Sequence, residues 1–254
     1  MSDETTEVID VEVEAEATTG TKKAPKTIAR LEEEGEEEEE PETLTPQIPI
    51  LLDLLDLFGI PVVGVDDYEA DDLMATFSVK QNGPIRIVTG DRDLFQLVDD
   101  NRDVKVVYLA KGISNHDLVD LSWIEDKYEI PGDRYSLFAM IRGDSSDGLP
   151  GIRGIGEKGA ATIANQFKSL PEVMTAAQSG DERLTPNLRK KLLESSDYAL
   201  IAPKLVGCAL DVAIPEMSIE LPIKPKSLAK ITRLKEEFGL GASIDRIMAA
   251  LGWI

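Results

Sequence analysis

Short apolar runs alternate with a helical segment between residues 60 and 109, and this alternation limits the possible folds more than any other feature. Residues 60–65, 85–88 and 104–109 have the composition of buried strands, and residues 68–81 have the pattern of a helix that begins with acidic residues. Strands that alternate with helices predict a parallel, twisted α/β sheet with helices on both of its faces. In such a sheet the functional crevice lies beyond the carboxyl ends of the strands.

Three acidic clusters lie where these elements begin or end. They are Glu69-Ala70-Asp71-Asp72, Asp91-Arg92-Asp93 and Asp144-Ser145-Ser146-Asp147, and they place seven carboxylates within 79 residues. Crowded carboxylates repel one another, so such a gathering is expected to need cations. Oxygen ligands suit Mg²⁺ or Mn²⁺, and paired ions of this kind cut or transfer phosphodiesters. The predicted metal ligands are Glu69, Asp71, Asp72, Asp91, Asp93, Asp144 and Asp147.

Each cluster also has a simpler explanation when it is taken alone. Acids in the first turn of a helix complement the helix dipole, which would account for residues 69–72. Asp91 and Asp93 could belong to a solvated turn, and Asp144 and Asp147 could cap the next helix. The occurrence of all three clusters at element ends favours metal binding over these separate explanations.

A glycine-rich segment follows the third cluster and has the form of a helix-hairpin-helix turn. It reads Gly151-Ile152-Arg153-Gly154-Ile155-Gly156-Glu157-Lys158. Glycines let a backbone approach a phosphate closely, and the N–H groups at the start of the following helix point toward it. Such contacts read the shape of a nucleic acid rather than its sequence. The expected contact residues are Gly151, Arg153, Gly154, Gly156, Lys158, Arg189 and Lys190. The alternative to phosphate contact is a tight turn with a purely structural role. For Arg189 and Lys190 the alternative is a solvated helix face.

The chain is acidic overall but locally basic beside this turn. Its net charge is −21, yet residues 151–204 hold eight basic and six acidic residues. Binding of a polyanion needs local positive potential rather than a basic total, so the net charge does not exclude DNA. The single cysteine and single histidine exclude an internal disulfide and a Cys/His zinc site. No apolar run is long enough to span a membrane and the first residues lack a secretory pattern, which predicts a cytoplasmic protein without membrane contact.

Four segments differ in character. Residues 1–45 are acidic and of low complexity, lack aromatic residues and are expected to be disordered. Residues 46–141 hold the α/β pattern of the core, residues 142–205 the hairpin and its helices, and residues 206–254 a helical segment expected to pack on that core. Helices are expected at residues 48–58, 118–128, 135–142, 158–167, 187–194 and 243–251.

The motifs resemble the structure-specific 5′ nuclease family, which includes bacterial 5′–3′ exonucleases, the 5′-nuclease domain of DNA polymerase I and flap endonucleases. The resemblance lies in residues 68–72, 89–97 and 142–151, in that order and spacing, and continues through Gly156-Glu157-Lys158. It covers about residues 46–254. The resemblance implies a PIN-like sheet domain followed by a helical subdomain of the helix-hairpin-helix (H3TH) type.

The resemblance also implies an activity, namely metal-dependent 5′–3′ exonuclease action on double-stranded or 5′-flap DNA in replication and repair. Glu69 and Asp71, with Asp72, would serve one ion, and the other four carboxylates would serve a second. The implied cofactors are two Mg²⁺ or Mn²⁺ ions, with K⁺ at the hairpin turn, in a monomeric protein. The implied catalytic residues are Glu69, Asp71, Asp91, Asp93 and Asp144.

Residues 1–45 depart from the family pattern. Family members open with an apolar strand that ends in an aspartate ligand, followed by a second strand with another aspartate and a basic arch. Here an acidic segment stands in that place, with Asp10 as a weak substitute for the first ligand. We therefore expect two ligands to be missing, through a mis-set start, a truncated gene or divergence, and the activity to be weakened, altered or absent. The alternative is a non-catalytic, structure-selective DNA-binding protein. An RNA-cutting single-domain nuclease is disfavoured because it would not need the hairpin.

Overall fold

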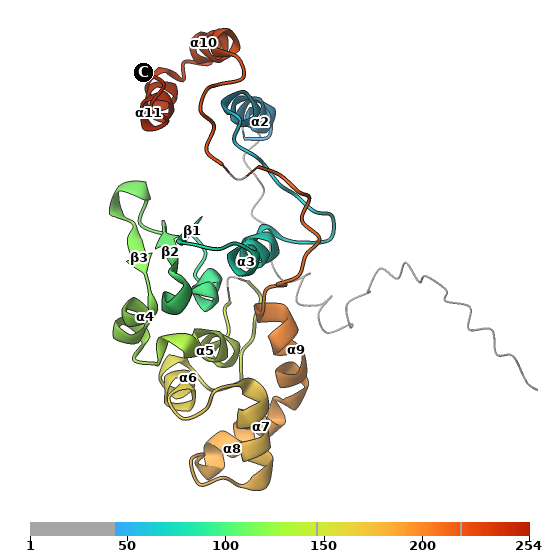
Figure 1. Ribbon diagram of the computed structural model, residues 1–254. Helices are drawn as coiled ribbons and strands as arrows, with labels where there is room; N and C mark the ends of the chain where they lie inside the picture. The colour runs from blue at the N-terminus through green and yellow to red at the C-terminus, as the bar shows by residue number, and fades with distance from the viewer. Residues whose placement is uncertain (1–43, 146, 219) are drawn as a thin grey trace, which may run out of the picture. The chain divides into compact units, whose positions relative to one another are not determined.

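The computed structural model describes residues 44–145, 147–218 and 220–254 (Figure 1). The predictions for residues 1–43, including their disorder and the substitute ligand Asp10, lie outside the described residues. Within the described part, the buried apolar residues form two clusters, a large one around the sheet and the following helices and a smaller one among three helices. The acidic clusters belong to the part of the chain that builds the large one.

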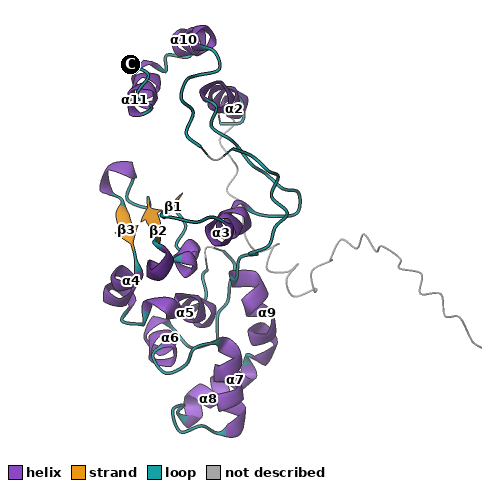
Figure 2. Ribbon diagram, viewed as in Figure 1, coloured by secondary structure: helices purple, strands orange, loops and turns teal. Residues whose placement is uncertain are grey.

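A small sheet carries the second acidic cluster. Within the described residues it has three strands in the order β1-β2-β3, namely β1 (Ile85–Thr89), β2 (Val104–Tyr108) and β3 (Asp117–Val119) (Figure 2). β1 and β2 are parallel, and β3 is antiparallel to β2 because the eight residues between them are too few for a crossover helix. The strands predicted at residues 85–88 and 104–109 are present. The predicted fold class, an α/β sheet domain followed by a helical subdomain, is confirmed.

Two local predictions in this region are wrong. Residues 60–65 form no strand and have no β-pairing within the described residues, and Val62 is 58% exposed. Pro61 has no N–H to donate, and an apolar run without a partner strand leaves its backbone groups to water. Residues 118 and 119 belong to β3 rather than to a helix. The helix α4 (Leu121–Tyr128) begins only after Asp120, whose side chain accepts the Trp123 N–H at 2.9 Å.

The residues after β1 are fixed by an aromatic core. The 3₁₀ helix η1 (Asp93–Leu97) begins with a predicted ligand and buries Leu94 and Phe95 completely. The Phe95 ring lies 4.9 Å from that of Tyr108 and 5.3 Å from that of Tyr135, centroid to centroid. Rings this close contribute packing energy beyond their buried area. The backbone that carries Asp93 is therefore held by the core rather than by a free loop.

The helices agree with the sequence in part. The helix predicted at residues 135–142 is α5 (Tyr135–Arg142), and the further predicted helices are α6 (Glu157–Ala164), α8 (Pro186–Glu194) and α11 (Gly241–Ala250). Three helices were not predicted, namely α7 (Leu170–Ser179), α9 (Ser196–Val206) and α10 (Leu228–Glu237). Pro203 lies inside α9 and interrupts its helical pattern, whereas Pro171 lies in the first turn of α7. No helix among the described residues is long and apolar enough to cross a membrane.

The helix α2 (Gln47–Phe58) packs with α10 and α11 around the smaller core. Gly59 ends α2 in the left-handed conformation, as its position predicts. Phe58 is buried, and its ring stacks on Trp253 at 5.8 Å between centroids. The C-terminal helices thus cover the first described helix. The predicted boundaries at residues 46, 142 and 206 stay predictions.

Candidate active site

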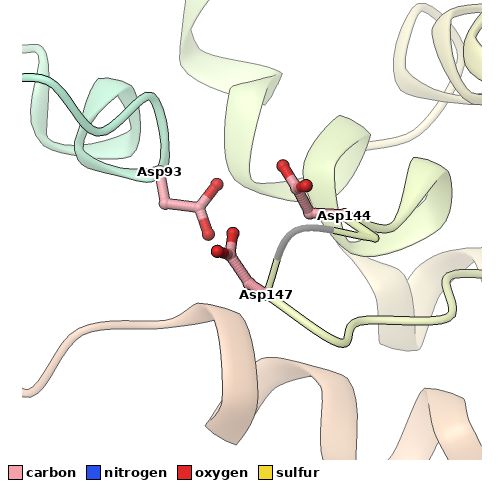
Figure 3. Close-up of side chains that lie close together, drawn as sticks. All are labelled: Asp93, Asp144 and Asp147. Atoms are coloured by element: carbon pink, nitrogen blue, oxygen red, sulfur yellow. The ribbon is translucent and has the colours of Figure 1, made fainter. Parts of the chain in front are cut away.

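Three aspartates from two distant segments converge on one space (Figure 3). One carboxylate oxygen from each of Asp93, Asp144 and Asp147 lies within 4.8 Å of the other two. Asp93 begins η1, whereas Asp144 and Asp147 follow α5. Carboxylate oxygens at this spacing can share one divalent cation.

Local hydrogen bonds hold both segments in place. Asp91 Oδ1 accepts the Asp93 N–H at 2.7 Å, and the Asp91 N–H donates to Thr89 Oγ1 at 3.0 Å, so the chain turns directly after β1. In the second segment, Asp144 and Leu149 exchange backbone hydrogen bonds of 2.9 and 2.7 Å. This bridge closes the loop that carries Asp147. The two turns therefore fix the acids before any ligand is bound.

The first acidic cluster faces the same space. A cavity of about 310 Å³ is lined by acids from all three clusters together with Gln96, Leu149 and residues 205–208. Its acidic residues are Glu69, Asp71, Asp72, Asp91, Asp93 and Asp147. Asp144 lines a neighbouring hollow that shares Asp91 and Asp147 with the first. The structure thus brings all seven predicted ligands together, and their role as ligands stays a prediction.

Crowding changes the acidity of these carboxyl groups. Burial, followed by the charges of Asp91, Asp147 and Asp144, raises the pKa of Asp93 to about 6. Burial and the charge of Asp91 raise the pKa of Asp71, and burial and the charge of Asp144 raise that of Asp147. A bound divalent cation would favour the ionised forms instead. Clustered carboxylate oxygens of this kind are a donor set that fits Mg²⁺ or Mn²⁺.

Asp72 differs from its neighbours because both of its oxygens accept backbone hydrogen bonds. Oδ1 accepts the Ala209 N–H at 2.6 Å, and Oδ2 accepts the Glu69 N–H at 3.3 Å in a capping box. The second bond begins the helix α3 (Ala70–Lys80) at Glu69, and the first ties that helix to a segment far along the chain. The structure therefore gives Asp72 a supporting contact in addition to its predicted place among the ligands.

Two further side chains of α3 continue this tie, and the sequence reasoning missed them. Thr76 Oγ1 donates to Ala209 O at 3.1 Å and accepts the Val212 N–H at 3.2 Å, and Lys80 Nζ donates to Val212 O at 2.7 Å. Asp72, Thr76 and Lys80 are four residues apart, so they share one helix face. They hold residues 209–212, which continue from the cavity wall at residues 205–208. The sequence signal for these two residues was the polar side chain at every fourth position of a helix that is otherwise partly buried.

Removing the Thr76 hydroxyl is expected to loosen this wall. Thr76 is fully buried, so Thr76→Val would leave Ala209 O and the Val212 N–H without their partner. We expect a loss of about 2 kcal/mol in the free energy of unfolding, measured by urea denaturation. Thr76→Ser keeps the hydroxyl and is the control. Equal stability of the valine variant and the wild type would contradict this role.

Two arginines contact Asp144, which the sequence reasoning also missed. Arg92 Nε lies 2.8 Å from Asp144 Oδ2, Arg92 Nη2 contacts the same oxygen, and Arg142 Nη2 lies 3.4 Å from it. Asp144 is only 6% exposed. Buried carboxylates are costly without a partner of opposite charge, which these guanidinium groups supply. Arg92 stands between two predicted ligands, so its position in the sequence was a usable clue.

The glycine-rich segment forms the turn between α5 and α6. Gly143 and Gly151, both with positive φ, lie back to back, and a Cβ on Gly151 would stand 2.6 Å from Arg142 O. Gly156 precedes α6 as its N-cap residue. Lys191 Nζ donates to Gly154 O at 2.6 Å, which ties the turn to α8. The turn therefore has a structural role, because it joins the end of α5 to α8 through these contacts.

The expected phosphate-contacting residues lie at and near this turn. Arg153, Gly154, Gly156 and Lys158 are exposed, Arg189 is half-buried, and Gly151 is buried. Lys190 is exposed beside Glu194, with 3.8 Å between Nζ and Oε1. An exposed pair of this kind contributes little stability and leaves the lysine accessible. Contact with DNA at these residues stays a prediction.

Comparison with known sequences identifies relatives over most of the chain. Residues 30–129 match the family model for the 5′–3′ exonuclease N-terminal resolvase-like domain, and residues 130–229 match that for the 5′–3′ exonuclease C-terminal SAM fold. The chain is 45% identical over 214 residues to a 5′–3′ exonuclease of Streptomyces coelicolor, a match that covers 84% of this chain and 71% of that protein. It is 37% identical over 222 residues to a 5′–3′ exonuclease of Mycobacterium tuberculosis, covering 84% and 70%.

Solved structures share the fold. A bacteriophage T5 flap endonuclease, determined as a pseudo-enzyme-product complex with DNA and metal ions, matches with a TM-score of 0.51 and 18% sequence identity. The match covers 72% of this chain and 65% of that chain, so this chain spans just under two thirds of its length. At this level of identity, the likeness concerns the fold.

Proposed function

The chain belongs to the 5′–3′ exonuclease family of nucleases, and from this premise we propose that it hydrolyses DNA from a 5′ end or flap by a two-metal mechanism. The observation that carries the proposal is the convergence of Asp93, Asp144 and Asp147 on one space, beside a cavity lined by the first acidic cluster. The proposed substrate is double-stranded or 5′-flap DNA. We also propose action in the cytoplasm, from the sequence, and a monomer with K⁺ at the hairpin, from the family resemblance.

The chain's own residues would act by holding charge in place. Asp93, Asp144 and Asp147 would hold one divalent cation, and Glu69 and Asp71 a second across the shared cavity. When bound, such ions supply an activated water and stabilise the leaving oxygen of a phosphodiester. Burial and the neighbouring carboxylates raise the pKa of Asp71, Asp93 and Asp147, and a bound cation would favour the ionised form of each. The turn before α6 would hold the duplex through its phosphates.

A panel of end-labelled substrates tests this function. We expect the protein to shorten a 5′-labelled flap duplex and a blunt duplex in Mg²⁺ or Mn²⁺, and to leave both intact in EDTA. A single strand of the same sequence is the comparison for duplex preference. Absence of cleavage in both metals would contradict the proposed activity.

A non-catalytic DNA-binding protein is the second candidate. It is favoured by the contacts of Asp144 with Arg92 and Arg142, since a carboxylate already paired with arginine is partly satisfied without a metal. This candidate predicts salt-sensitive duplex binding that does not depend on metal and is unchanged in Asp91→Ala and Asp144→Ala. The same variants would lose cleavage under the first proposal.

The duplex contact has its own test. The double variant Arg153→Ala, Lys158→Ala is expected to bind duplex DNA about tenfold more weakly at physiological salt, because it removes two cations beside the turn. The slope of log affinity against log salt should fall in magnitude by about two. Lys127→Ala, an exposed lysine of α4, is the matched control. Equal binding by the double variant and this control would contradict a phosphate contact at the turn.

A further inference from the structure

Arg92 combines two relations that a surface arginine does not usually have. It lies between Asp91 and Asp93 in the chain, and its guanidinium contacts Asp144 Oδ2 through Nε at 2.8 Å and through Nη2. That carboxylate also belongs to the group of three whose oxygens lie within 4.8 Å of one another. Asp144 therefore pairs with the Arg92 guanidinium and is also one of the three acids that could hold a divalent metal ion.

The two cations would compete because they would stand on the same carboxylate. A divalent ion held by Asp93, Asp144 and Asp147 would share the Asp144 carboxylate with the Arg92 guanidinium, and two cations on one carboxylate repel each other. Asp144 is only 6% exposed, so little water surrounds the carboxylate that the two cations would share. Binding of the metal ion would therefore weaken the contact between Arg92 and Asp144, and this contact would in turn weaken binding of the ion.

Of the two arginines on Asp144, Arg92 is the one that can leave. The Arg142 side chain is 11% exposed, its guanidinium stacks over the Phe138 ring at 5.2 Å, and its Nε donates to Gly143 O at 3.0 Å. The Arg92 side chain is 40% exposed and borders the hollow shared by Asp91 and Asp147. Arg142 therefore has contacts that keep it in place when Asp144 takes a different partner, whereas Arg92 faces open space.

We propose that Arg92 is a positioning residue that serves as the internal counter-cation of Asp144 in the metal-free protein and gives up this carboxylate when a divalent cation binds. The inference rests on the proposed metal site. It means that the measured metal affinity includes the cost of displacing Arg92, so the arginine sets the metal concentration at which the site fills.

The direction in which Arg92→Gln changes the affinity for Mn²⁺ tests the inference. Mn²⁺ is titrated into the protein by calorimetry without DNA, and Arg92→Gln is expected to bind it about tenfold more tightly than the wild type, because a competing positive charge is removed. Arg92→Lys keeps the charge but loses the two-nitrogen contact, and it should fall between the two. Arg86→Gln, which removes an exposed arginine paired with Asp103, is the matched control and should bind as the wild type does.

The outcomes separate this inference from the proposed function. Equal or weaker Mn²⁺ binding by Arg92→Gln would overturn it, because an arginine that merely supports the shape of Asp144 would weaken binding when removed. Asp93→Asn should bind Mn²⁺ more weakly, which locates the titrated site. If the wild type binds no Mn²⁺ at all, the proposed metal site fails, and the inference fails with it. Urea denaturation of each variant verifies that the changes are not caused by unfolding.

Discussion

Asp93→Asn is expected to remove metal-dependent cleavage while making the metal-free protein more stable. Cleavage should fall by at least about 100-fold, because the amide loses the negative charge that a divalent cation needs. Stability should rise, because the pKa of Asp93, raised to about 6 by burial and by neighbouring aspartates, shows that the ionised carboxyl is unfavourable in the fold. After a discount for partial solvent screening, the gain at pH 7 is about 1 to 2 kcal/mol.

The pH dependence of this gain follows from the direction of the shift. The folded protein keeps the Asp93 proton up to about pH 6, whereas the unfolded chain loses it near pH 4. Asp93 therefore makes the wild type lose stability as the pH rises through this window, and Asp93→Asn removes this contribution. The stability difference, measured by urea denaturation in EDTA, should be absent below about pH 4 and complete above about pH 6. Asp126→Asn, an exposed acid of α4, should show neither effect. A variant that is destabilised at pH 7 would contradict the proposed crowding.

Gly151→Ala is expected to cause the largest loss of stability. Gly151 has φ of +64°, and an added Cβ would stand 2.6 Å from Arg142 O and 2.7 Å from the Gly143 nitrogen. Those atoms are backbone, so the clash can be relieved only by separating the end of α5 from the turn. We expect a loss of at least about 3 kcal/mol in the free energy of unfolding, measured by urea denaturation.

Gly156→Ala is the matched control for this change. Gly156 has φ of −88°, and no atom lies within 4 Å of the position that an added methyl group would take. Its stability should stay within about 1 kcal/mol of the wild type. The two variants also separate the structural role of the turn from its role in DNA binding. Gly156→Ala should weaken duplex binding, without loss of stability, if the backbone at Gly156 approaches a phosphate. Similar stability of the two alanine variants would contradict the close approach at Gly151.

The predictions that agree with the structure rest on residues that are close together in the sequence. The residues of α5 match the predicted helix, and Gly59 and the glycines of the turn mark chain reversals through their backbone freedom. The grouping of the carboxylates could also be predicted, because acids that follow β1 and acids that begin α3 lie at element ends. These features depend on neighbouring residues, so one sequence is sufficient to find them.

Where they differ, the decision lay in contacts between distant residues. The apolar composition of residues 60–65 suited a strand, but no partner strand is present within the described part of the chain. Arg92 reaches Asp144 across 52 positions, and Asp72 reaches Ala209 across 137. The sequence marks these side chains, by the four-residue spacing of Asp72, Thr76 and Lys80 and by the place of Arg92 between two acids, but it does not identify their distant partners. The partners of the supporting residues are therefore known only from the fold, whereas the candidate ligands can be identified from the sequence.

The central claim is that these carboxylates form a metal-dependent nuclease site, and the cleavage of a 5′-labelled flap duplex at increasing Mn²⁺ tests it most directly. The wild type is compared with the double variant Asp93→Asn, Asp147→Asn, after both have been shown to fold. We expect cleavage that rises with Mn²⁺ in the wild type and is lost in the double variant. Equal cleavage by both proteins, or cleavage that persists in EDTA, would contradict the claim.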